Sequence, residues 1–336
     1  RGDMHFWSVW HEGRSFEEYY SIKPRFVSEF GYQSFPSLST VATYAQPSMW
    51  NLTSVEMEHH QKNPRGNSII IENFSRYYRF PTSFEQMLYL SQVQQATAMK
   101  MAIEYWRTTL PHCMGTLYWQ LNDNWPVASW SSIDYTGKWK LLHYAARRFY
   151  APVLPIAYQK EDGKIEVYIV NDGPKAVEDA KLSVKFSTFD AQKLGKQEYR
   201  LTIESKSSTH MCTIDLKRKH KLDQRKTFIY IKLKSDDLYI ENCLLLDKPK
   251  ACELVDPQLQ TKVEKVSGGF SVTVSCTYPA FEVALDAQDL KGVFSDNLFA
   301  IRPTAQKVVV FKTQEKITLK QFREKLKVFD LYNSGR

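Results

Sequence analysis

A chain of 336 residues that is 43% hydrophobic and 24% charged has the composition of a folded globular protein, which excludes a disordered or fibrous one. Its net charge of +8 raises the question of nucleic acid, but the basic residues are spread over turns such as Lys217–His220, and no nucleic-acid motif accompanies them. The five cysteines form no CxxC pair, and no apolar run reaches the ~18 residues of a membrane span. We therefore expect neither a nucleic acid nor a membrane as a partner, and neither a zinc site nor a disulfide framework.

Up to about residue 152, the sequence alternates strand-like segments with helices. Met4–Trp10 and Arg25–Phe30 are short apolar runs bounded by polar loops, which is typical of buried parallel strands. A long helix is predicted over Ser83–Thr108, a third strand-like run over Met114–Leu121 and a final helix over Trp139–Tyr150. This order is typical of a (β/α)8 TIM barrel, although about three strands make less than half of one.

The predicted long helix carries a regular apolar stripe, which indicates one buried face. The stripe residues step by three or four positions: Met87, Leu90, Val93, Ala96, Met99, Ile103 and Trp106. Pro111 is expected to end the helix, because proline cannot continue it.

Beyond residue 152, short runs of alternating apolar residues predict antiparallel β structure. Asp162–Gly163 is a hairpin signal. The alternating sets are Ile165, Val167 and Ile169; Leu182, Val184 and Phe186; Ile229, Ile231 and Leu233; Phe270, Val272, Val274 and Cys276; and Phe281, Val283 and Leu285. A break at Asp247–Pro249 divides them, so the pattern predicts two successive β-sandwiches of ~90 residues each.

The clearest candidate for chemistry is Glu29, which stands at the end of a short apolar strand. The carboxyl end of a barrel strand opens on the active site, so Glu29 should point into a pocket. A carboxylate beside Phe26 and Phe30 is costly unless it is paired or has a catalytic role. The spacing alone leaves two interpretations open, a catalytic carboxylate and a structural ion pair. Arg25 could supply that pair, although it begins the strand and so lies near the opposite end.

The third strand-like run carries Trp119 near its end, followed by the polar residues Asn122, Asp123 and Asn124. A flat apolar face beside amide and carboxylate groups suits a sugar subsite. A core tryptophan followed by a polar turn explains these residues as well.

Two histidines and two tryptophans lie between His5 and His11. A metal site is disfavoured because no third ligand follows at a suitable spacing. Packing of these rings is the simpler interpretation, and a sugar-lining role for Trp7, Trp10 or His11 remains open.

Taken together, five ordered segments resemble the β-mannosidases of glycoside hydrolase family two. They are His5–His11, Pro24–Pro36, Tyr118–Asp123, Gly137–Tyr144 and Gly292–Asn297. The Ser-Glu-Phe-Gly sequence at residues 28–31 marks the wider family, and the Trp-Gln-Leu-Asn-Asp sequence at 119–123 points to the mannosidase branch.

The resemblance implies that Glu29 is the catalytic nucleophile and that Trp119 lines the subsite for the terminal sugar. It also implies pocket roles for Trp7, Trp10 and His11, and we add Asn122 as a substrate-binding candidate. It further implies that residues 1–152 are the C-terminal part of a catalytic TIM barrel. Residues 153–246 and 247–336 would then be two immunoglobulin-like β-sandwich domains.

One departure from the family pattern concerns the general acid/base, a Glu that follows an Asn on an earlier barrel strand. No Asn-Glu pair precedes Glu29, so the resemblance implies a C-terminal fragment that is inactive alone and whose partner is the missing N-terminal part of the polypeptide. The implied reaction is the removal of terminal β-linked mannose with retention, which needs two carboxyl groups and neither a metal nor an organic cofactor.

Other interpretations stay open at this stage. A different family-two exo-glycosidase is one: a β-galactosidase, a β-glucuronidase or an exo-β-glucosaminidase. A non-catalytic carbohydrate-binding protein built from β-sandwiches is another, since residues 153–336 show no catalytic constellation in the sequence. The compartment is undetermined: lysosomal or secreted in a eukaryote, periplasmic or cytoplasmic in a bacterium.

Overall fold

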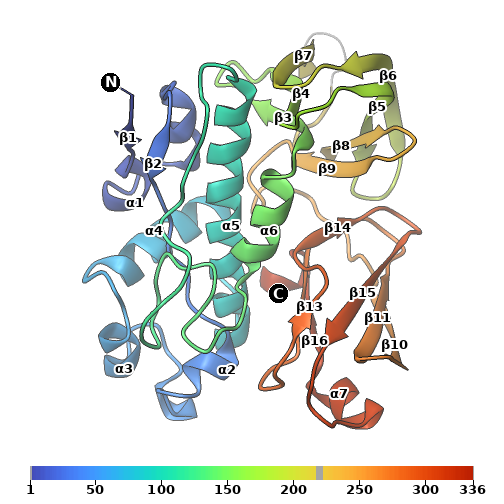
Figure 1. Cartoon of the computed structure of the whole chain (residues 1–336). Coiled ribbons are helices and arrows are strands. Elements are labelled where there is room, and N and C mark those ends of the chain that lie inside the picture. Colours follow the sequence, from blue (N-terminus) through green and yellow to red (C-terminus); the bar gives the residue numbers. More distant parts are fainter. Residues whose placement is uncertain (1, 217–221, 336) are drawn as a thin grey trace.

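The structure is a computed structural model that describes residues 2–216 and 222–335. The basic turn expected at 217–220 lies outside the described residues. Figure 1 shows a helix-rich part beside two β-rich parts, which follow one another along the chain and lie one above the other. None of the described helices is long and apolar enough to cross a membrane.

The helix-rich part contains one short parallel strand pair and several helices. Its strands and helices are β1 (Met4–His5), α1 (Ser8–His11), the 3-10 helix η1 (Phe16–Ser21), β2 (Val27–Glu29), α2 (Leu38–Val41), the 3-10 helix η2 (Pro47–Met49), α3 (Val55–His59), α4 (Gly66–Tyr77), α5 (Phe84–Thr108) and α6 (Leu141–Phe149). The predicted long helix (Ser83–Thr108) and the predicted final helix (Trp139–Tyr150) are thus confirmed within a few residues.

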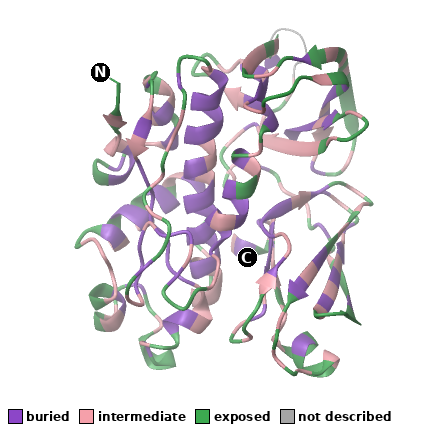
Figure 2. Ribbon diagram, in the orientation of Figure 1, coloured by how far each residue is buried: buried purple, intermediate pink, exposed green. Residues whose placement is uncertain are grey.

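Helix α5 begins where the sequence predicts, because the Ser83 hydroxyl accepts a hydrogen bond from the backbone N–H of Gln86. Every residue of the predicted stripe except Met87 is buried. Burial is nevertheless wider than one face, since Gln94, Gln95 and several other polar residues are buried as well (Figure 2). The prediction of a single buried stripe was therefore too narrow, because α5 packs against η1, α6 and the strand β3 (Val153–Gln159).

Strands β1 and β2 pair in parallel, as predicted, but the expected strand over Met4–Trp10 is shorter than the apolar run. Residues Ser8–His11 form helix α1, so Trp10 and His11 do not lie on a strand. The physical reason is that a short apolar run does not by itself distinguish strand from helix, and the helical turn buries Val9 and Trp10 together. The run over Met114–Leu121 contributes an isolated parallel bridge, Val27↔Thr116, instead of a regular strand.

The first β-rich part holds two sheets with strand orders β3-β4-β7 and β6-β5-β8-β9. The strands are β3 (Val153–Gln159), β4 (Ile165–Asn171), β5 (Val177–Thr188), β6 (Lys193–Ile203), β7 (Ser207–Ile214), β8 (Thr227–Lys234) and β9 (Tyr239–Leu245). The predicted alternation is confirmed: its apolar residues on β4, β5 and β8 meet in one buried cluster between the sheets.

The second β-rich part repeats this plan with orders β10-β11-β15-β13 and β14-β12-β16. Its elements are β10 (Gln260–Val266), β11 (Gly269–Ser275), β12 (Ala280–Asp286), β13 (Val293–Phe294), β14 (Phe299–Ile301), β15 (Gln306–Lys312), α7 (Leu319–Lys325), β16 (Lys327–Phe329) and the 3-10 helix η4 (Asn333–Gly335). Phe322 on α7 stacks on Phe270 at 4.4 Å between ring centroids, so the helix closes the end of this core.

Candidate active site

The carboxylate of Glu29 lies at the C-terminal end of β2, where the parallel pair with β1 ends. Its Oε2 accepts a hydrogen bond from the indole N–H of Trp7 at 3.2 Å. His5 Nδ1 lies 3.3 Å from the same oxygen, and the Glu29 side chain is 34% exposed. The ion-pair partner of Glu29 among the described residues is therefore His5 rather than Arg25, and the carboxylate stays accessible from solvent.

A second carboxylate stands behind His5. Asp3 Oδ2 lies 3.7 Å from His5 Nε2 and accepts a hydrogen bond from the Ser28 hydroxyl at 2.9 Å. That hydrogen bond lowers the pKa of the exposed Asp3. His5 thus lies between the carboxylates of Asp3 and Glu29.

A group of aromatic rings lies beside Glu29. Trp130 packs edge-on against Trp7 at 6.1 Å and against Trp10 at 5.8 Å, both between ring centroids. Trp10 is fully buried and also contacts Tyr32 at 5.1 Å, whereas Trp7 and Trp130 are only half-buried. Trp10 therefore supports the other two rings from behind. His11 is exposed, and its ring lies 5.2 Å from that of Trp7.

Trp119 lies next to the strand that carries Glu29, and its side chain is 46% exposed. Its backbone N–H donates to the carbonyl of Phe30 at 2.7 Å. A Cβ on Gly31 would lie 2.3 Å from the Trp119 carbonyl oxygen, so glycine is required for this close approach. The exposed Asn122 follows, with its carbonyl accepting from the Gln120 side chain at 2.6 Å.

The structure thus brings Glu29, Trp7, His11 and Trp119 to one region and places Trp10 beneath it. His5 and Trp130 complete the region. His5 belongs to the predicted histidine- and tryptophan-rich segment, but neither residue was predicted to be part of the site. The N–H of the Trp130 ring is buried and makes no hydrogen bond to the described residues. A carboxylate next to exposed aromatic faces is suited to a sugar, which offers hydroxyl groups and an apolar C–H face.

A buried lysine connects the two segments that build this region. The ammonium of Lys140 donates to the carbonyls of Ser34 and Ser129, each at 3.2 Å, and these two residues also pair with each other. Ser34 follows the Glu29 segment, and Ser129 precedes Trp130. Burial lowers the pKa of Lys140 to about 8, with Asp123 and Asp134 acting in the opposite direction.

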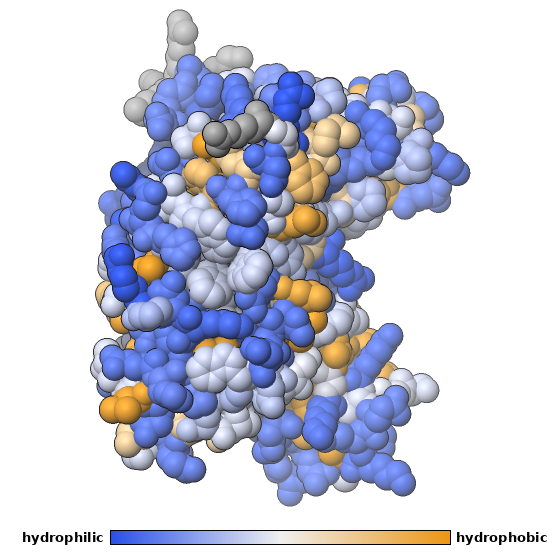
Figure 3. All heavy atoms as spheres, turned by 60° about the vertical axis from the view of Figure 1, so that its left-hand side comes forward, coloured by the Kyte–Doolittle hydropathy of each residue, from blue (hydrophilic) through white to orange (hydrophobic). Residues whose placement is uncertain are grey.

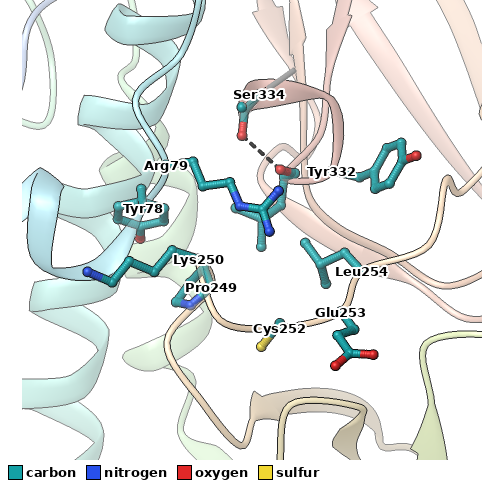
Figure 4. A pocket seen from close by; sticks show the side chains of 11 residues that line it. Tyr78, Arg79, Pro249, Lys250, Cys252, Glu253, Leu254, Tyr332 and Ser334 are labelled. Atoms are coloured by element: carbon teal, nitrogen blue, oxygen red, sulfur yellow. Dashed lines mark hydrogen bonds between the residues drawn. The ribbon is translucent and has the colours of Figure 1, made fainter.

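The described residues also line cavities away from this region, and the two considered next are not lined by Glu29 or its neighbours. One of about 280 Å3 lies between the end of α4, the segment 249–254 and the C-terminal residues (Figure 4). The other, of about 590 Å3, lies between α5, α6, β9 and the second β-rich part. Over residues 2–216 and 222–335, no group of three or more His, Cys, Asp or Glu side chains is placed to hold a metal ion.

The fold and the site define a class of multidomain protein. Its helix-rich part carries an accessible carboxylate beside aromatic rings, and two immunoglobulin-like domains follow. A mannosidase Ig/CBM-like domain family matches residues 163–251, and an Ig-fold domain family of mannosidases matches residues 254–334. These matches confirm the predicted immunoglobulin-like domains of the second half.

Comparison with known proteins identifies the family. The chain is 40% identical to the β-mannosidase of Capra hircus over 52% of its own length and 21% of that protein. It is 27% identical to β-mannosidase A of Emericella nidulans over 88% of its length and 36% of that protein. The crystal structure of a β-D-mannosidase from Dictyoglomus thermophilum superposes with a TM-score of 0.87 at 30% identity, covering 98% of this chain and 40% of that one. The chain belongs to the β-mannosidases of glycoside hydrolase family two.

A more distant likeness concerns the fold alone. The exo-chitosanase of Amycolatopsis orientalis superposes with a TM-score of 0.68 at 14% identity, over 92% of this chain and 42% of that one. The chain spans about one fifth to two fifths of the length of the proteins named here.

Proposed function

We propose that the whole protein is a retaining exo-β-mannosidase in which Glu29 is the nucleophile. The observation that carries this proposal is the Glu29 carboxylate at the carboxyl end of a parallel strand pair. It is accessible and held by the indole N–H of Trp7. A carboxylate attacks in its ionised form, and the hydrogen bond from Trp7 orients the Glu29 carboxylate.

The first part of the chain fits the C-terminal portion of a (β/α)8 barrel. Support comes from the parallel pairing of β1 with β2, the parallel bridge from Val27 to Thr116 and the helices α5 and α6. We propose that residues 1–152 form this portion of the barrel, and that 153–246 and 247–336 are the two immunoglobulin-like domains.

The proposed reaction proceeds in two steps. An oxygen of Glu29 forms a bond to the anomeric carbon while the bond to the leaving oxygen breaks, and a second carboxylic acid protonates that oxygen. The same second group then removes a proton from water, which displaces Glu29 and releases mannose with its β configuration. Retaining enzymes hold the two carboxyl groups about 5–5.5 Å apart. We propose that an N-terminal part of the same polypeptide supplies the second one.

The exposed apolar residues beside β2 support this partner. Met114, Leu117, Trp119 and Leu121 are between 46% and 66% exposed along one segment, although such side chains are usually covered. We propose that the N-terminal part covers some of them and that the terminal mannose of an oligosaccharide packs on Trp119. Trp7, His11 and Asn122 would contact its hydroxyl groups, with Trp10 as the support.

The test is turnover of p-nitrophenyl β-mannoside by the whole protein and by its Glu29→Gln variant. Glu29→Gln should abolish turnover, whereas Glu264→Gln, an exposed glutamate on β10, should leave it unchanged. Retained turnover in Glu29→Gln would refute the nucleophile. The chain of 336 residues alone should release no p-nitrophenol, and measurable release would refute the need for a second carboxylate from elsewhere.

A second sugar specificity merits a direct comparison because of the fold shared with an exo-chitosanase. A panel of aryl β-glycosides carrying mannose, glucosamine, galactose and glucuronic acid separates the alternatives. Highest kcat/KM on the mannoside is the expected result.

A further inference from the structure

The cavity of about 590 Å3 lies where all three parts of the chain meet, away from Glu29. Helices α5 and α6 form one wall, β9 of the first β-rich part forms the second, and residues of β12 and 295–308 form the third. In Figure 3 the outline of the molecule is indented between its upper and lower lobes. Sites between domains are frequent locations for small-molecule binding.

Glu282 is directed toward this cavity by an irregularity in β12. The pairing of β12 with β14 shifts register between Ala280 and Val283, and Glu282 has a φ of +52°. A positive φ is costly for a residue with a side chain, and bulges often redirect a side chain near a functional site. The Tyr89 hydroxyl on α5 donates to the Glu282 carbonyl at 2.6 Å and fixes this backbone.

The Glu282 carboxylate lines the cavity without a hydrogen bond or an ion pair to the described residues. Burial raises its pKa, and the positive charges of Lys100 and Arg148 act against that effect. The two cations nearest in effect to Glu282 are engaged by other carboxylates: Lys100 pairs with Glu104 at 3.0 Å, and Arg148 pairs with Asp296 at 2.8 Å. An unpaired carboxylate in such a wall is available to accept hydrogen bonds from a ligand.

The balance of charges in the lining indicates the class of ligand. Four cationic residues, Lys100, Arg147, Arg148 and Lys307, oppose the four acidic residues Glu104, Glu241, Glu282 and Asp296. A wall with balanced charge attracts neither a phosphate nor a polycation strongly. A neutral ligand rich in hydroxyl groups can donate to Glu282 without disturbing the ion pairs of Lys100 and Arg148.

The rim adds an aromatic surface. Tyr239 on β9 is 55% exposed and lines the cavity together with Tyr230 and Phe299. The C–H face of a sugar ring packs well on such a ring, as it does at the proposed active site. A volume of about 590 Å3 falls within the 300–1,000 Å3 range of small-ligand sites.

We propose that this cavity is an accessory site for a neutral oligosaccharide, with Glu282 accepting hydrogen bonds from its hydroxyl groups and Tyr239 packing on a sugar ring. The site is separate from Glu29 and serves to retain a substrate or product rather than to cleave it. The proposed mannosidase function enters only in the choice of manno-oligosaccharides as the first probe.

The test is isothermal titration calorimetry of the 336-residue chain with mannotriose, and with inorganic phosphate as a charged probe. Glu282→Ala and Tyr239→Ala should each weaken mannotriose binding roughly tenfold or more, as expected for loss of a charged hydrogen bond or an aromatic contact. Glu264→Ala is the matched control and should bind as the unaltered chain does. Absence of mannotriose binding, or binding that both cavity variants retain, would overturn the proposal, as would phosphate binding that depends on Glu282.

Two further variants separate this site from folding and from the active site. Glu282→Gly relieves the positive φ, so it should melt no lower than the unaltered chain and still lose binding. Trp119→Ala should retain binding if the cavity is the site. Loss of binding in Trp119→Ala with retention in Glu282→Gly would assign the sugar to the active site and refute the accessory site. Because these are binding measurements, turnover by Glu29→Gln would contradict only the proposed nucleophile.

Discussion

Replacing Lys140 with methionine tests whether a buried charge holds the candidate site together. Lys140 is 2% exposed, and no carboxylate lies within ion-pair distance of it among the described residues. Its ammonium donates only to the carbonyls of Ser34 and Ser129, at 3.2 Å each. Methionine keeps the length and the apolar character of the side chain and removes the charge.

The magnitude follows from the pKa. Burial lowers the pKa of Lys140 from 10.5 to about 8, so the unfolded chain binds more protons than the folded chain between these values. Folding stability due to this group therefore rises with pH between about 8 and 10.5, and it does not change with pH below about 8, where both states are protonated. A shift of this size corresponds to a cost of about 3 kcal/mol for the charged form at pH 7. Lys140→Met removes this cost, which stabilises the variant at pH 7. It also removes two hydrogen bonds from a charged donor, and the loss of each one destabilises the variant by about 1.5–3 kcal/mol.

The assay is urea unfolding of both chains at several pH values from 7 to 10.5. We compare the unfolding free energies of the original chain and Lys140→Met at each pH. The titration of all other groups contributes equally to both chains and cancels in the difference. We expect the unfolding free energy of the original chain to rise relative to that of Lys140→Met by about 2–3 kcal/mol as the pH is raised from 7 to 10.5. A difference that does not depend on pH would refute a buried, charged Lys140. The intrinsic fluorescence of the folded variant reports whether the tryptophans beside Ser129 have moved.

Three further outcomes are expected. Gly31→Ala places a Cβ 2.3 Å from the Trp119 carbonyl and should destabilise the chain by about 1–3 kcal/mol in urea unfolding, whereas Gly2→Ala, which meets nothing within 4 Å, should not. Phe322→Ala removes the ring stacked on Phe270 and should cost about 3–5 kcal/mol, and a loss below about 1 kcal/mol would contradict its place in the core. Burial raises the pKa of Glu166, but hydrogen bonds from Thr213 and His210 outweigh it, so the pKa is lowered from 4.5. Its contribution should be present above pH 4.5 and disappear as the pH falls further, and an acid unfolding curve unchanged in Glu166→Gln would show that it has none.

The parts of the fold that the sequence predicted are those with long, regular periodicity. Helix α5 combines a 25-residue pattern with a serine cap, and the β-strands alternate over five or more residues. Short segments were predicted less well. Val9 and Trp10 sit in a seven-residue apolar run, which is too short to separate a strand from a helical turn.

The candidate site shows the same division. Glu29 could be found because a carboxylate at the end of an apolar strand is a local signal. Lys140 could not, because its contact with Ser34 spans 106 positions in the sequence and no local pattern marks it. Glu282 was missed because its direction depends on a register shift against β14, which only the paired strands reveal.

The described residues of the second immunoglobulin-like domain (247–335) contribute nothing to the Glu29 region. The domain nevertheless contacts the segment that forms one side of that region. The ammonium of Lys138 donates to Asp286 Oδ1 at 2.6 Å and to the Gln288 carbonyl at 2.8 Å. Lys138 lies two residues before Lys140, whose ammonium joins the Glu29 segment to the Trp130 loop. One short segment thus contacts the domain through one lysine and the candidate site through the next. Because the ammonium groups of both lysines are held by hydrogen bonds, displacement of the domain would strain the candidate site. This is a physical reason for the domain to accompany the helix-rich part.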